Sequence, residues 1–166
     1  MPKAGDAREP YIAEFCFYSG CFTIKYIYLS RILAIDYGLK RTGLAVTDPF
    51  KIIATGLTTI DSKLLITFLK NYFSLEPVEL ILIGEPKNLD DSDTHASPLV
   101  AQFIKELSKN FPQVPIMKID ERYTSKMAVQ SMIQSGMKKK DRRNKALVDE
   151  IAATILLQEY LQHNQP

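Results

Sequence analysis

Cysteine and histidine are scarce in this chain, and their scarcity excludes several classes of site. Only Cys16 and Cys21 are present, with no second cysteine pair and no nearby histidine to complete a zinc site. Nothing marks the chain as exported, so we expect these two thiols not to form a disulfide. His95 lies in a polar segment and His163 in the C-terminal tail, where we expect solvated side chains rather than catalysis.

Long apolar runs are missing as well. No stretch reaches the roughly 20 apolar residues that a membrane-spanning helix requires. The first residues do not resemble a signal peptide, because Asp6, Glu9 and Glu14 interrupt them. We therefore expect a cytoplasmic protein with no membrane partner.

The composition predicts one globular domain with a local basic segment. The 166 residues are 46% hydrophobic and 24% charged, with a formal net charge of +2. Residues 138–145 hold six basic side chains and one acidic side chain, a local charge of +5 that leaves the rest of the chain at −3. A basic segment on a mildly acidic body is suited to an anionic partner.

The hydrophobic pattern predicts an α/β fold. Apolar runs and turn residues predict strands over residues 31–36, 42–47, 52–59, 79–84 and 114–120, the last at a sheet edge because of Pro115. Helical spacing and caps predict helices after Asp61–Ser62, from Pro98, from Thr124 to about Ser135 with Gly136 as its end, and from Ala146 to about Gln162. A meander of three strands followed by alternating helices and strands predicts a mixed sheet with helices on its faces.

The sequence pattern divides the chain into two parts near residue 30. Residues 31–162 carry the regular pattern of one domain, whereas residues 1–30 are poorly patterned and rich in aromatic side chains. Two interpretations of this N-terminal extension stay open. It adds an extra strand to the domain edge, or it is no part of the native protein because translation starts near Leu29.

Three acidic residues lie where secondary structure elements begin or end. Asp36 ends the first regular strand, Glu121 follows the strand that finishes at Asp120, and Asp149 lies in the first turns of the last helix. Clustered carboxylates repel one another, so a divalent cation between them would explain the arrangement. Two such ions about 3.5–4 Å apart can hydrolyse a phosphodiester bond. The alternative is that these acids are solvated caps and surface ion pairs.

Four segments together resemble the YqgF family. They are Asp36-Tyr-Gly-Leu-Lys-Arg-Thr-Gly-Leu-Ala45, Ile83-Gly-Glu-Pro-Lys-Asn88, Asp120-Glu-Arg-Tyr-Thr-Ser125 and Val148-Asp-Glu-Ile-Ala-Ala153, in the family's order from about Ser30 to Leu161. The resemblance implies a ribonuclease H-like fold. It also implies a nuclease that matures the 5′ end of pre-16S ribosomal RNA in ribosome biogenesis, or a homologue of Holliday junction resolvases. The polar loop after Pro86 departs from the glycine-containing form of the family.

The resemblance also implies the site. Asp36, Glu121 and Asp149 would be the catalytic acids that bind Mg²⁺ or Mn²⁺, with Glu85 as a fourth candidate ligand. Arg41 and Arg122 would hold a phosphate. The basic segment lies close in sequence to the last helix, which suggests that it contacts the nucleic-acid backbone. Its basic residues are Lys138, Lys139, Lys140, Arg142, Arg143 and Lys145.

Four functions are consistent with the residues. The first is a metal-dependent hydrolase that acts on structured RNA, with pre-rRNA or a ribosomal precursor particle as its partner. The second is a resolvase of branched DNA, which would need a firm dimer, whereas we expect a monomer or weak homodimer. The third is an actin-like ATPase or sugar kinase, for which the chain is too short to build two domains. The fourth is a non-catalytic ribosome-assembly factor that binds RNA, although all three carboxylates are present.

Overall fold

A mixed five-stranded sheet forms the centre of the fold. The computed structural model describes residues 12–18, 21–27, 29–85, 97–120 and 124–164. The sheet contains β3 (Arg31–Tyr37), β4 (Arg41–Thr47), β5 (Ala54–Asp61), β6 (Val78–Glu85) and β7 (Ile116–Asp120) in the order β5-β4-β3-β6-β7. The first three strands pair antiparallel as a meander, while β6 and β7 run parallel to β3. The predicted mixed sheet is confirmed.

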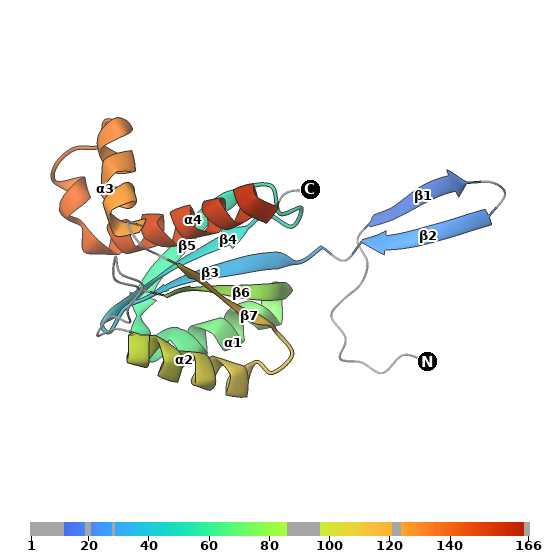
Figure 1. The fold of residues 1–166 in the computed structure, drawn as a ribbon, viewed down its shortest axis with the longest axis horizontal. Helices are drawn as coiled ribbons and strands as arrows, with labels where there is room; N and C mark the ends of the chain where they lie inside the picture. The colour runs from blue at the N-terminus through green and yellow to red at the C-terminus, as the bar shows by residue number, and fades with distance from the viewer. Residues whose placement is uncertain (1–11, 19–20, 28, 86–96, 121–123, 165–166) are drawn as a thin grey trace.

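Helices cover both faces of this sheet (Figure 1). The helices are α1 (Leu65–Leu75), α2 (Ser97–Asn110), α3 (Thr124–Gln134) and α4 (Lys145–Asn164), with short 3₁₀ turns η1 (Ser62–Leu64) and η2 (Asp141–Arg143). In Figure 1, α1 and α2 lie below the sheet and α4 lies above it. Helix α3 stands at the N-terminal end of α4 and contacts it.

The alternation of side chains along β3 separates the core into two halves. Leu33 and Ile35 pack in the cluster that contains the buried residues of α1 and α2. Ile32 and Ala34 face the other way and pack in the cluster that contains Ala153 and its apolar neighbours on α4. Both faces of β3 are therefore buried, as the continuous apolar run Ile32–Ile35 predicts.

Local signals fix several element ends. Asp61 is the N-cap of η1, and its Oδ1 accepts a hydrogen bond from the Lys63 backbone N at 2.9 Å. Gly136 follows α3 with a φ of 75°, a left-handed conformation that glycine adopts without steric cost. Strand β7 lies at the edge of the sheet, where Pro115 predicts it.

The N-terminal segment forms a separate hairpin. Strands β1 (Ile12–Tyr18) and β2 (Cys21–Ile27) pair antiparallel with each other and belong to a different sheet from β3–β7. The interpretation of this segment as a strand added to the domain edge is therefore wrong. Only two residues separate the strands in sequence, so local pairing costs little loop-closure entropy.

None of the helices in the described part of the chain combines the length and apolar character that a membrane span requires.

Candidate active site

Asp36 lies on the side of the sheet that α4 covers. Its side chain follows the alternation of Ile32 and Ala34, which pack against that helix. Its backbone is opposite Gly43 of β4. The pKa of Asp36 is raised to about 6, mainly by burial and to a smaller extent by the negative charge of Asp149. Within the described residues, no hydrogen bond to the Asp36 carboxylate compensates this burial. Asp36 is thus a partly buried carboxylate with no counter-charge among the residues that the structure describes.

Asp149 reaches Asp36 because α4 lies very close to the sheet. Ala153, four residues after Asp149, is fully buried and packs with Ala34 and Ala45 of the sheet. Ala152 packs instead with Ala128 of α3. Gly43 removes the remaining obstacle, since a Cβ there would lie closer than 3.0 Å to the carbonyl group of Asp149. Only glycine leaves room for this helix position. The prediction that two alanines let α4 lie close to the sheet is confirmed for Ala153, whereas Ala152 packs against α3.

Strand β5 also holds the first turns of α4. Thr59 donates a hydrogen bond from Oγ1 to the carbonyl oxygen of Ala146 at 2.7 Å. Gly56 leaves space for the side chain of Glu150, which a Cβ at that position would overlap. These contacts fix the start of α4 relative to β4 and β5. The position of Asp149 therefore depends on two strands as well as on its own helix.

Arg41 supplies the positive charge that compensates Asp149. Its Nε donates a hydrogen bond to Asp149 Oδ2 at 3.0 Å, and the two side chains are 40% and 28% exposed. Residues 41, 43 and 45 of β4 share the face that α4 covers, so Arg41 lies on the same side of the sheet as Asp36. The structure thus brings Arg41 together with two of the predicted acids. Contact between Arg41 and a phosphate stays a prediction.

Glu85 is turned towards the opposite side of the sheet. It continues the alternation of Ile81 and Ile83, whose side chains pack with α1 and α2. Its Oε1 accepts a hydrogen bond from Lys118 Nζ of β7 at 2.7 Å. The structure therefore does not group Glu85 with Asp36 and Asp149. This orientation argues against Glu85 as a fourth metal ligand.

Two predicted residues, Glu121 and Arg122, lie outside the described residues. Both follow directly after β7 in the chain. Among the residues that the structure does describe, no group of three or more acidic, histidine or cysteine side chains could hold a metal ion. The pair of Asp36 and Asp149 still fits a hard divalent cation, because the partly buried Asp36 lies near a second carboxylate and has no counter-charge among the described residues.

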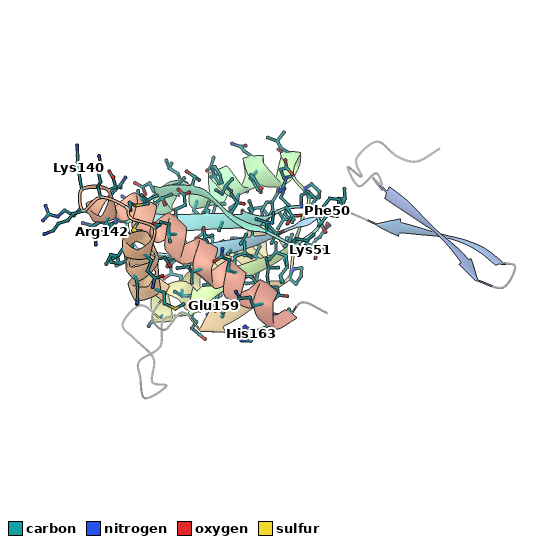
Figure 2. All side chains as sticks on the ribbon, turned by 90° about the horizontal axis from the view of Figure 1, so that it is seen from above. Phe50, Lys51, Lys140, Arg142, Glu159 and His163 are labelled. Carbon is teal, nitrogen blue, oxygen red and sulfur yellow. The ribbon has the colours of Figure 1, made fainter. Side chains whose placement is uncertain are left out.

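The basic segment lies at the same end of α4 as Asp149. Lys145 is the first residue of α4, one helical turn before Asp149. Figure 2 shows Lys140 pointing away from the body of the protein at this end, far from Phe50 and Lys51. Lys138, Lys139, Lys140, Arg143 and Lys145 are exposed. Arg142 differs, because it is partly buried and its Nε is covered by protein without a hydrogen-bond partner. We therefore expect the exposed residues, rather than Arg142, to make most phosphate contacts.

Sequence reasoning missed the role of Gly43 and the ion pair of Arg41. A signal for Gly43 was available, since a glycine inside a strand pattern often marks the close approach of another backbone. The ion pair joins residues 108 positions apart, and no local pattern indicates it.

Comparisons with known proteins identify the family of this chain. The family model described as "RuvX: Holliday junction resolvase" matches residues 30–163. A protein of Christiangramia forsetii named "Putative pre-16S rRNA nuclease" is 58% identical over 133 residues, which cover 80% of this chain and 98% of the relative. A protein of Bacteroides thetaiotaomicron with the same name is 50% identical over 134 residues, covering 81% of this chain and 97% of the relative.

A solved structure shares the fold. The structure described as "T. thermophilus RuvC in complex with Holliday junction substrate" matches with a TM-score of 0.52 and 14% identity. The match covers 81% of this chain and 96% of that chain. At this identity the likeness concerns the fold alone, and it confirms the ribonuclease H-like class predicted from the sequence.

Proposed function

The chain belongs to the RuvX family, and from this premise we propose that it is a cytoplasmic nuclease that uses Mg²⁺ or Mn²⁺ to process the 5′ end of pre-16S rRNA. One observation carries the metal dependence. Asp36 is partly buried beside Asp149 with no counter-charge of its own in the described residues, an arrangement that a divalent cation would compensate. The names of the curated relatives support RNA as the substrate.

In this proposal, Asp36, Asp149 and Glu121 hold the cation. When bound at this site, two such ions would supply an activated water and stabilise the leaving oxygen of the cleaved phosphodiester. Above about pH 6, Asp36 carries the negative charge that a ligand needs. Ala153 and Gly43 let α4 lie close to the sheet, so Asp149 stays beside Asp36. No nucleophilic side chain of the protein is required.

Branched DNA is the alternative substrate, favoured by the description of the family model. A resolvase cuts two symmetric strands and would need a firm dimer. We propose a monomer or a weak homodimer instead, since the sequence offers no clear dimer stripe. Analytical ultracentrifugation at micromolar concentration distinguishes the two, because a stable dimer would favour the resolvase.

Asp36→Asn is expected to abolish cleavage while RNA binding is retained, because it removes a metal ligand and leaves the basic segment intact. The assay incubates the full chain with a 5′-extended 16S rRNA fragment or a four-way DNA junction, with Mg²⁺, Mn²⁺ or EDTA. Glu159→Gln is the matched control, since it neutralises another acid on α4 well beyond the end that carries Lys140 (Figure 2). Cleavage in EDTA, or wild-type cleavage by Asp36→Asn, would contradict the proposed site.

The basic segment should control the salt dependence of RNA binding. Replacing Lys138, Lys139 and Lys140 with glutamine removes three exposed charges and leaves the partly buried Arg142 in place. Each lost phosphate contact to single-stranded RNA lowers the slope of log K against log salt by about 0.7, so the triple variant should lose about 2. Fluorescence anisotropy between 50 and 300 mM KCl, roughly the range in which such slopes are measured, gives this slope.

A matched control variant replaces three other lysines with glutamine. These are Lys70, Lys105 and Lys109, which are exposed on α1 and α2. These helices cover the opposite face of the sheet, so the slope for this variant should equal that of the wild type. Equal salt slopes for the wild type and both variants would indicate that residues 138–140 are a solvated surface that does not contact RNA.

A further inference from the structure

Arg41 of β4 forms an ion pair with Asp149 of α4. Its Nε lies 3.0 Å from Asp149 Oδ2, and it shares the α4-covered side of the sheet with Asp36. Of the two grouped carboxylates, Asp149 therefore has a positive partner within the described residues, and Asp36 has none. The guanidinium neutralises one of two acids that would otherwise repel each other without metal.

The same contact conflicts with metal binding. A cation bound by Asp149 needs lone pairs of its carboxylate oxygens, and the Arg41 N–H already takes one of the roughly four that the group offers. The positive charge of Arg41 also repels a divalent ion that binds beside it.

We propose that Arg41 is a positioning residue that competes with the metal for Asp149 and lowers the metal affinity of the protein before substrate binds. This inference rests on the proposed function, because it assumes that Asp149 is a metal ligand. Only one of the five guanidinium N–H groups has a partner in the described residues. When the cation takes Asp149, Arg41 is released with all of its donors free for a non-bridging phosphate oxygen. Metal and substrate binding are coupled through this exchange.

The coupling predicts the sign of a metal-affinity change. An ion pair of this exposure contributes about 0.2–1 kcal/mol, so its removal should tighten Mn²⁺ binding by roughly 1.4- to fivefold. Isothermal titration calorimetry of MnCl₂ into the full chain, without nucleic acid, measures the dissociation constant. Arg41→Gln is the test variant. Arg41→Lys keeps the charge but changes the donor geometry, and it should bind Mn²⁺ with an affinity between those of wild type and Arg41→Gln.

Thermal melting in EDTA gives a second readout. Arg41→Gln should melt below wild type, because Asp149 loses its counter-charge beside Asp36. In the Asp149→Asn background the same substitution should leave the melting temperature unchanged, since no ion pair remains to break. A purely structural role of Arg41 would lower the melting temperature in both backgrounds, and that outcome would overturn the inference.

The outcomes separate this inference from the proposed function. If wild type and Asp36→Asn show the same weak Mn²⁺ binding, the metal site itself is absent and both fail. If wild type binds Mn²⁺ through Asp36 but Arg41→Gln binds equally or more weakly, only the competition fails. Tighter binding by Arg41→Gln supports it.

Discussion

Asp36→Asn should abolish the loss of stability that the wild type shows between pH 4 and pH 7 in EDTA. Burial and the charge of Asp149 raise the folded-state pKa of Asp36 from 3.8 to about 6. Between these values the folded protein binds more protons than the unfolded chain, so the free energy of unfolding falls as pH rises. The total loss is about 3 kcal/mol and is complete once pH exceeds the folded-state value. An asparagine cannot ionise, so this part of the pH dependence should disappear.

At pH 7.5 the variant should also melt above the wild type by a few degrees. The expected gain is smaller than the full effect, because the buried asparagine amide costs about 1–3 kcal/mol if it finds no partner. Calorimetry in EDTA at a series of pH values measures both effects. Millimolar Mn²⁺ should then raise the free energy of unfolding of the wild type, by about 2.7 kcal/mol at 100 times the dissociation constant. The free energy of unfolding of Asp36→Asn should stay almost unchanged.

Asp149→Asn provides the internal comparison. This substitution removes the repulsion with Asp36 but also breaks the ion pair with Arg41. The two effects oppose each other, so its melting temperature in EDTA should change less than that of Asp36→Asn. If Asp36→Asn instead melts below wild type at pH 7.5 and keeps the same pH dependence, Asp36 is a structural acid. The metal hypothesis would then lose its physical basis.

The fold could be predicted where the sequence pattern is local. Continuous apolar residues predict the two-sided burial of β3, and Pro115 predicts the edge position of β7. The start of β5 was misplaced by two residues because the side chain of Asp48 holds the preceding turn. Its Oδ1 accepts hydrogen bonds from the backbone N of Ile52 at 2.7 Å and of Ile53 at 2.6 Å. Both isoleucines are exposed in this turn despite their apolar side chains.

The candidate site was less predictable because it depends on long-range register. The acid positions at element ends suggest convergence, and the alanines after Asp149 indicate close packing of α4. The side of the sheet that the Glu85 side chain faces can be inferred only by alternation from buried neighbours on the same strand. This alternation places the side chain with Lys118 rather than with Asp36. Pairing of Arg41 with Asp149 requires the docking of α4 on β4, which no local sequence pattern encodes.

Gly43→Ala should destabilise the protein by about 2–3 kcal/mol and greatly reduce cleavage. The new methyl group would overlap the carbonyl group of Asp149 and approach the backbone N of Glu150, so α4 itself must move. That movement carries Asp149 away from Asp36, whose backbone pairs with Gly43. Urea unfolding followed by circular dichroism measures the stability loss. Cleavage and Mn²⁺ affinity, measured at a temperature where the variant is folded, show whether the site is separated.

Gly56→Ala is the matched control on the neighbouring strand. A methyl group there also meets α4, but it overlaps the flexible side chain of Glu150 rather than helix backbone. That side chain can rotate away, so the substitution should cost less than about 1 kcal/mol and leave Mn²⁺ binding intact. The contrast separates helix displacement from a general effect of a larger residue in the sheet. If Gly43→Ala folds with wild-type stability and binds Mn²⁺ normally, then close contact between β4 and α4 does not position Asp149.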